Sequence, residues 1–248
     1  MRKLFKYPIA LPLFLVGLAA LLRIILAVLG WPVTNSDESI MNLMALHIAY
    51  RGEHPTFFYG QHYLSPFEAY VGAVLFRIFE PSVLVMRLEM IGLSVTFLIS
   101  LYILVKRLYT RKFALVVLAF LALGSPMVFR RQMEAVGWPE LPLFLALLFL
   151  LAYGLTCNGG HWSWTRRAMA YGAWGIFAGF ALYGHAVTAP YVLASFSLLV
   201  LWRPHEVLRM GLWSILAGFV IGTFPLLWYN LHAVPGRNDS LTIALHMT

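Results

Sequence analysis

The chain has 248 residues, of which 61% are hydrophobic and 11% are charged, and its formal net charge is +8. A mean hydropathy of +0.79 excludes an ordinary soluble globular domain. We therefore expect an all-α polytopic membrane protein, with residues 1–248 forming a single transmembrane module.

Apolar runs recur along the chain at lengths close to the roughly 17–25 residues that cross a bilayer. The first run contains Arg23 and lacks a small-residue cleavage site, so we interpret it as a span and not as a cleaved signal peptide. About seven spans are expected, the third and sixth of them short. They are Leu11–Gly30, Val83–Val105, Phe113–Met127, Leu141–Thr156, Ala168–Tyr183, Tyr191–Trp202 and Gly211–Tyr229.

A further apolar stretch, Pro66–Phe79, has about 14 residues and contains Glu68 and Arg77, so we interpret it as a juxtamembrane helix that does not cross. An outer loop then runs over residues 31–82, with juxtamembrane helices at 37–51 and 66–79. This choice places the basic turn of residues 106–112 in the cytoplasm with the N-terminus, as the positive-inside rule requires.

Most of the remaining charges follow the same topology, although Arg130 and Arg131 of the second outer loop break the pattern. The positive net charge is therefore a sign of orientation and not of nucleic-acid binding. The expected cytoplasmic charges are Arg2, Lys3, Lys6, Lys106, Arg107, Arg111, Lys112, Arg166, Arg167, Arg203 and Arg209, with Glu206 opposing them. The expected outer acids are Asp37, Glu38, Glu53, Glu68, Glu80, Glu134, Glu140 and Asp239.

Two acids follow the first span directly, in the stretch Asn35-Ser36-Asp37-Glu38. Asn35 or Ser36 is a plausible N-cap, and the spacing of Asn35 and Glu38 matches a capping box. One interpretation is that Asp37 and Glu38 only favour the helix dipole. The other is that they are catalytic acids, because a polar and aromatic segment follows them outside the membrane.

That segment, from His54 to Ser65, contains proline and glycine without helical periodicity and is expected to be a loop. Its rings could form an interfacial aromatic belt. Its polar groups are candidates for substrate binding: His54, Tyr59, Gln61 and His62, together with Glu68 of the following helix. The histidines match no zinc spacing, and the single Cys157 allows no intrachain disulfide. We predict no cofactor, although a metal ion stays open.

The second outer loop has two adjacent arginines, Arg130 and Arg131, which suit bidentate contacts to phosphate. The alternative is an Arg130–Glu134 pair at helical spacing, or snorkelling to headgroups. Glu134 and Glu140 are the candidate acids of this loop. Arg87, about one turn inside the second span, is expected to face a polar cavity, a lipid phosphate, or an acid, either Glu89 or an outer-loop acid such as Glu68.

The order of these features is similar to a known family. After the first span come Ser36-Asp37-Glu38, the stretch FFYGQHYLSPFEAY, the segment FEPSVLVMRL, the basic turn VKRLYTRK, the GWPE of the second outer loop and FPLLWYN in the last span. This pattern resembles the N-terminal module of GT-C membrane glycosyltransferases, in particular bacterial relatives of the protein mannosyltransferases and of the aminoarabinose lipid A transferase.

The resemblance implies inverting transfer of a sugar from a polyprenyl-phosphate donor to a lipid, glycan or protein acceptor outside a bacterial inner membrane. It makes Asp37 the base and Glu134 or Glu140 a second acid. A lysine found in some relatives before the interfacial helix is replaced by Leu64-Ser65, so Arg87, Arg130 or Arg131 would supply the phosphate contacts. Family members are longer, which predicts the N-terminal part of a larger protein. The alternatives are a transporter or lipid flippase and a non-catalytic lipid-binding remnant.

Overall fold

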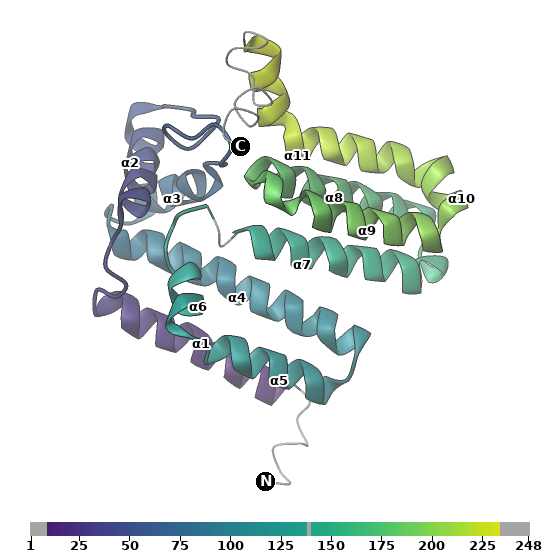
Figure 1. The fold of residues 1–248 in the computed structure, drawn as a ribbon, viewed down its shortest axis with the longest axis horizontal. Coiled ribbons are helices and arrows are strands. Elements are labelled where there is room, and N and C mark those ends of the chain that lie inside the picture. Colours follow the sequence, from purple (N-terminus) through teal and green to yellow (C-terminus); the bar gives the residue numbers. More distant parts are fainter. Residues whose placement is uncertain (1–8, 138–139, 234–248) are drawn as a thin grey trace. The chain divides into compact units, whose positions relative to one another are not determined.

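The computed structural model describes residues 9–137 and 140–233, and the regular structure in this part is helical (Figure 1). Arg2, Lys3, Lys6, Trp138, Pro139 and Asp239, which entered the topology and motif predictions, lie outside the described residues. The elements are α1 Ala10–Val28, α2 Ser36–Arg51, α3 Phe67–Ile78, α4 Val83–Leu108, α5 Arg111–Ala122, α6 Pro126–Arg131, α7 Glu140–Tyr153, η2 Gly154–Asn158, η3 Gly159–His161, α8 Trp164–Gly184, η4 Ala186–Thr188, α9 Ala189–Trp202, α10 Pro204–Glu206, η5 Val207–Gly211 and α11 Leu212–His232.

Four helical stretches of the described residues are long and apolar enough to cross a membrane: Ala10–Val28, Val83–Leu108, Glu140–Cys157 and Pro204–His232. They indicate an integral membrane protein, as the composition predicts. Helices α2 and α3 coincide with the two expected in the first outer loop. The other three expected spans are Phe113–Met127, Ala168–Tyr183 and Tyr191–Trp202. They are helical, but their helices are not both long and apolar enough to be counted as membrane-crossing.

The third expected span shows why. Residues 113–127 do not form one helix, because α5 ends at Ala122 and α6 begins at Pro126. Ser125 caps α6, its hydroxyl accepting a hydrogen bond from the backbone N–H of Val128 at 3.4 Å, and proline is favoured at the first helical position. With 12 residues, α5 is about 18 Å long, shorter than the hydrocarbon core.

The chain, expected to be a single module, divides into two compact units. Unit 1 comprises Met1–Glu53 and Glu68–Leu143, and unit 2 comprises His54–Phe67 and Phe144–Thr248. The loop expected to bind substrate at residues 54–65 therefore belongs to unit 2, whereas the acids and arginines of both outer loops belong to unit 1.

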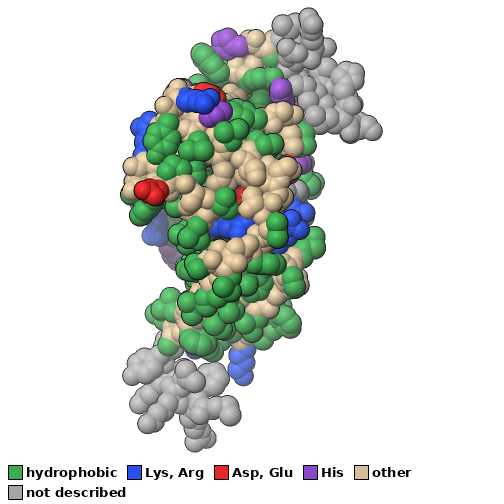
Figure 2. Space-filling view, turned by 90° about the vertical axis from the view of Figure 1, so that its left-hand side faces the viewer, with side chains coloured by type: hydrophobic (Ala, Val, Ile, Leu, Met, Phe, Trp, Pro, Cys, Tyr) green, Lys and Arg blue, Asp and Glu red, His purple; other side chains and the backbone are tan. Residues whose placement is uncertain are grey.

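Unit 1 is built on α1, α4 and α5, which pack side by side around Val16, Ala19, Leu98 and Leu118 (Figure 1). Helices α2 and α3 are joined by the Tyr50 hydroxyl, which donates to the Phe76 carbonyl at 2.6 Å, and by Arg77, which donates to the Ala49 carbonyl. Large apolar side chains of α1 remain exposed, as expected for a surface that meets lipid, and hydrophobic side chains cover much of the face in Figure 2.

Unit 2 is built on a close packing of α8 against α11. Glycines on both helices allow it: a Cβ on Gly175 would lie 2.2 Å from the Ile215 carbonyl oxygen, and one on Gly218 would lie 2.0 Å from the Gly172 carbonyl oxygen. Small residues let membrane helices approach until their backbones touch. Beside this seam, Trp174 donates from its indole nitrogen to the Ser195 hydroxyl at 3.1 Å, which satisfies a buried polar pair.

Substitution of Gly175 by alanine is expected to lower the thermal stability of the purified protein, because the new methyl group can fit only if α8 and α11 separate. Gly17→Ala is the matched control, since a Cβ at Gly17 of α1 has no atom within 4 Å. Thermal unfolding in detergent measures both. Equal Tm values for the two variants would contradict the glycine-dependent packing.

Candidate functional site

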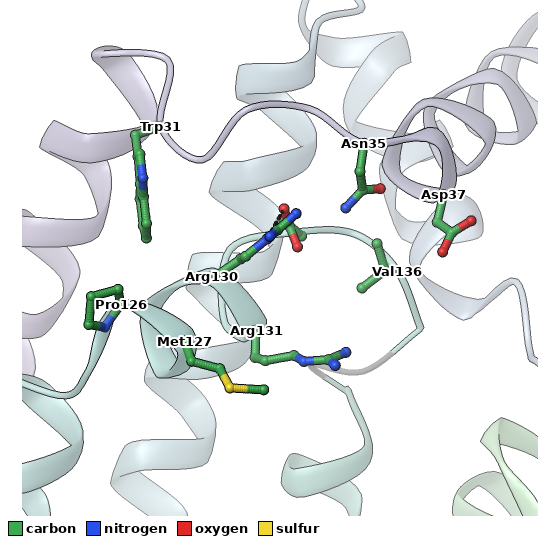
Figure 3. Close-up of a pocket in the computed structure, with 9 residues that line it drawn as sticks. Trp31, Asn35, Asp37, Pro126, Met127, Arg130, Arg131 and Val136 are labelled. Atoms are coloured by element: carbon green, nitrogen blue, oxygen red, sulfur yellow. Dashed lines mark hydrogen bonds and ion pairs between the residues drawn. The ribbon is translucent and has the colours of Figure 1, made fainter.

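A cavity of about 520 Å³ in unit 1 gathers polar residues of both outer loops. Its lining residues are Trp31, Asn35, Asp37, Pro126, Met127, Arg130, Arg131, Glu134 and Val136. Figure 3 shows Arg130 and Arg131 extending from the end of α6 toward the side where Asn35 and Asp37 lie. The cavity thus holds an exposed carboxylate, two guanidinium groups, an amide and an indole ring in a volume typical of small-molecule sites.

Asp37 reaches the cavity from the first turn of α2. The side chain of Asn35 accepts a hydrogen bond from the backbone N–H of Glu38 at 2.8 Å, so the N-cap is Asn35, one of the two candidates from the sequence. Asp37 is exposed at the cavity, whereas the neighbouring Glu38 is fully buried. Of the two adjacent acids, only Asp37 is placed to meet a bound molecule.

Glu38 instead binds Arg87 of α4. The guanidinium donates from Nε and Nη2 to the two carboxylate oxygens, each at 2.8 Å, and from Nη2 to the Pro32 carbonyl at 2.7 Å. Arg87 is 2% exposed and is not among the residues that line the cavity. A fork-to-fork pair of this kind fixes both partners. It ties the segment from Pro32 to Glu38, and with it Asp37, to α4.

The second outer loop supplies the other wall. Nε of Arg130 donates to Glu134 at 2.8 Å, the pair at helical spacing that the sequence offered as one interpretation. Glu134 is buried and the Arg130 side chain is about half exposed, and both residues line the cavity. Arg131 is exposed and lines the same cavity.

An apolar groove of about 380 Å³ adjoins the cavity. It is lined by Ser94, Phe97, Met127, Val128, Arg131, Gln132 and Pro142. Met127 and Arg131 belong to both linings. The two hollows together therefore form a polar compartment and an apolar compartment with an arginine between them.

Three glutamates are buried away from the cavity. Glu68 and Glu140 are fully buried, Glu89 is 7% exposed, and none of the three lines the cavity. One Glu68 oxygen accepts a hydrogen bond from the Gly137 backbone N–H at 2.8 Å. Burial raises the pKa of Glu68 well above its ordinary value, and the hydrogen-bonded carboxyl group of Glu140 raises it further. Of the two candidate acids in the second outer loop, Glu134 lines the cavity and Glu140 joins this buried group.

The remaining predicted binding residues lie in unit 2. Residues 58–64 form a tight turn in which the Phe58 N–H donates to the Leu64 carbonyl, and Gly60 adopts a positive φ. The His62 ring lies 6.0 Å from the Tyr229 ring of α11, and Phe57 contacts both rings.

The four predicted binding residues lie in this turn or just before it. His54 is exposed, and Tyr59, Gln61 and His62 are half-buried. The structure thus places these four residues in one aromatic loop of unit 2, and the Asp37 cavity belongs to unit 1.

No group of three or more histidine, cysteine, aspartate or glutamate side chains in the described ranges could hold a metal ion. The sequence interpretation missed two neighbours of Asp37: Trp31 and Asn35 both line the cavity. A signal for both was present, because a tryptophan at a span end is placed at headgroup height and an N-cap lies beside the residue that follows it.

Comparisons with known proteins add no further assignment. No family model, no curated protein and no solved structure matches the chain.

Replacing Arg87 by methionine is expected to destabilise the protein by about 3–5 kcal/mol, because it leaves the Glu38 carboxylate buried without its cation. The double variant Arg87→Met/Glu38→Leu removes both charges and should recover most of that stability. Unfolding of the purified variants in detergent measures the difference, with exposed Arg166→Met as the control. A double variant as unstable as Arg87→Met would show that Glu38 is not the group that requires Arg87.

Proposed function

We propose that the chain is part of a membrane glycosyltransferase that moves a sugar from a polyprenyl-phosphate donor to an acceptor at the non-cytoplasmic face. The observation that carries this proposal is the cavity with Asp37 on one wall and Arg130 and Arg131 on the other, adjoining an apolar groove. The resemblance of the sequence to GT-C glycosyltransferases points to the same reaction.

The two compartments fit the two halves of a lipid-phosphate sugar. The phosphate would lie at Arg131, which lines both compartments, with Arg130 beside it, because guanidinium groups bind phosphate oxygens through paired hydrogen bonds. The prenyl chain would lie in the groove beside Phe97 and Val128. The sugar would occupy the cavity, where the Trp31 indole offers it an apolar face.

The reaction then follows from the positions of the charged groups. Asp37 accepts the proton of the acceptor hydroxyl, whose oxygen attacks the anomeric carbon of the sugar. The bond from that carbon to the phosphate oxygen breaks, and its electron pair stays on the lipid phosphate, where Arg130 and Arg131 stabilise the added charge. Attack from the side opposite the departing phosphate inverts the anomeric carbon. Glu134 holds the Arg130 guanidinium in place.

The other predicted residues have structural roles in the proposed mechanism or lie in a separate loop. Glu38 and Arg87 hold the wall that carries Asp37, since each is the other's buried partner. Glu68 supports the second outer loop through its hydrogen bond with Gly137, and Glu140 lies against Glu68. The substrate-binding prediction for His54, Tyr59, Gln61 and His62 concerns a loop of unit 2 and stays a prediction, separate from the mechanism in the unit 1 cavity.

A transporter or lipid flippase is the second candidate, and one observation favours it. Glu68, Glu89 and Glu140 are buried together in unit 1, and buried ionisable groups in membrane proteins are typical of proton and substrate pathways. The two candidates differ in outcome: a transferase moves labelled sugar from the lipid onto an acceptor, whereas a transporter moves an unchanged molecule across a vesicle membrane.

The main test separates catalysis from binding. Asp37→Asn is expected to lower transfer of labelled sugar by at least about 100-fold, the usual contribution of a general base, while binding of polyprenyl phosphate stays unchanged. Arg131→Ala is expected to weaken that binding, with exposed Arg166→Ala of unit 2 as the control. Full transfer activity in Asp37→Asn would remove Asp37 from the mechanism, and unchanged affinity in Arg131→Ala would remove the phosphate site.

The proposal also requires the orientation deduced from the charges, with seven spans, a cytoplasmic N-terminus and the cavity outside a bacterial inner membrane. Single cysteines at Thr56 and Thr110 test it in a Cys157→Ser background, since Cys157 is exposed. An impermeant thiol reagent applied to intact cells should label position 56 and not position 110. The reverse pattern would place the Asp37 cavity on the cytoplasmic side and contradict the proposed site.

A further inference from the structure

We infer that Arg23, a residue of α1 outside the cavity, is the positioning residue for the wall that carries Arg130 and Arg131. The inference rests on the proposed function, because it concerns how the same lipid-phosphate site is held. Arg23 is fully buried in the middle of an apolar helix. It is not among the residues that line the cavity.

A buried guanidinium needs acceptors for its N–H groups, and the acceptors of Arg23 come from three segments. Within α1, Nη1 donates to the Ala19 carbonyl at 2.8 Å. From the end of α5, the carbonyls of Leu121 and Ala122 accept at 3.0 and 3.2 Å. From the second outer loop, the side-chain oxygen of Gln132 accepts from Nε at 3.0 Å and also from Nη2.

These contacts hold the cavity wall at both of its ends. Six of the nine lining residues come from one segment of the chain: Pro126, Met127, Arg130, Arg131, Glu134 and Val136. The α5 carbonyls lie just before this segment, and Gln132 directly follows Arg131. The Phe129 ring, on α6 itself, lies 4.2 Å from the Arg23 guanidinium carbon. Arg23 therefore contacts the segment before α6, within α6 and after it.

Through Gln132, Arg23 fixes the position of the backbone beside the proposed phosphate-binding arginines. Its backbone carbonyl accepts from the Ser94 hydroxyl of α4 at 2.9 Å, and its side chain is bound by Arg23. With both groups fixed, the backbone next to Arg131 has a single position relative to α1 and α4. Loss of the Arg23–Gln132 contact would free the end of α6, and both guanidinium groups would lose their alignment with a bound phosphate.

The contact differs from an ordinary buried ion pair, because no carboxylate in the described part of the chain forms a salt bridge with Arg23. A lysine at this position would keep the charge but could not reach Gln132 and the α5 carbonyls at once, since it lacks the planar fork. Comparison of the two side chains therefore separates positioning from a long-range effect of charge.

The experiment measures binding of polyprenyl phosphate to the purified full chain in nanodiscs. Arg23→Met and Gln132→Leu are each expected to weaken binding by about tenfold or more, equivalent to one charge-assisted hydrogen bond. The two effects should not add: the affinity of the double variant should equal that of the single variant with the lower affinity, because both changes remove the same contact. Arg23→Lys should not restore binding. Ser195→Ala, which removes a buried hydrogen bond of unit 2, should leave it unchanged.

A second readout follows the wall without any ligand. A spin label at Met127→Cys in a Cys157→Ser background should gain mobility in Gln132→Leu and Arg23→Met, but not in Ser195→Ala. If wild-type protein fails to bind polyprenyl phosphate while the label responds as expected, the proposed function fails and the positioning of α6 stands. Wild-type affinity in Gln132→Leu, full rescue by lysine, or an unchanged label would overturn the inference.

Discussion

The cavity depends on one constraint, which is that a guanidinium group buried in an apolar helical bundle must find an acceptor for its hydrogen-bond donors. Arg23 and Arg87 both meet this requirement with groups distant in sequence. Arg87 of α4 uses the Glu38 carboxylate and the Pro32 carbonyl, and so fixes the segment that carries Trp31 and Asp37. Arg23 of α1 uses Gln132 and the end of α5, and so fixes the segment that carries Arg130 and Arg131. Each wall of the cavity thus has its own buried arginine behind it.

The two buried arginines, Arg23 and Arg87, differ in the charge of their partners, and this difference affects which ligands the cavity can bind. Arg87 and Glu38 neutralise each other, as do Arg130 and Glu134 at the cavity edge. Arg23 is satisfied by neutral oxygens, so its positive charge is retained behind α6. Charges in a medium of low dielectric act over longer distances than in water. This retained charge supports the proposed phosphate site on the α6 side of the cavity, opposite the proposed base Asp37.

Helix positions were largely predictable, because hydrophobic periodicity, caps and prolines are local signals. Asn35 as the cap of α2 and the Arg130–Glu134 pair are both read from neighbouring residues. The break between α5 and α6 had a local signal too, in Ser125-Pro126. Which of the adjacent acids faces the cavity was not predictable. That choice is made by Arg87, 49 positions from Glu38, and no pattern in the sequence connects the two.

The second outer loop is also held by buried polar groups, among them an acid. It is held at Gln132 by Arg23 and at Gly137 by Glu68, so Glu134 and Val136 lie between two fixed points. The Gly137 N–H donates to one Glu68 oxygen, while Glu140 lies against the same carboxyl group. Burial and the neighbouring Glu140 carboxyl group both raise the pKa of Glu68. Glu68 therefore supports the loop through its hydrogen bond to Gly137, away from the cavity. In the proposed mechanism, the base is therefore Asp37, which is exposed at the cavity.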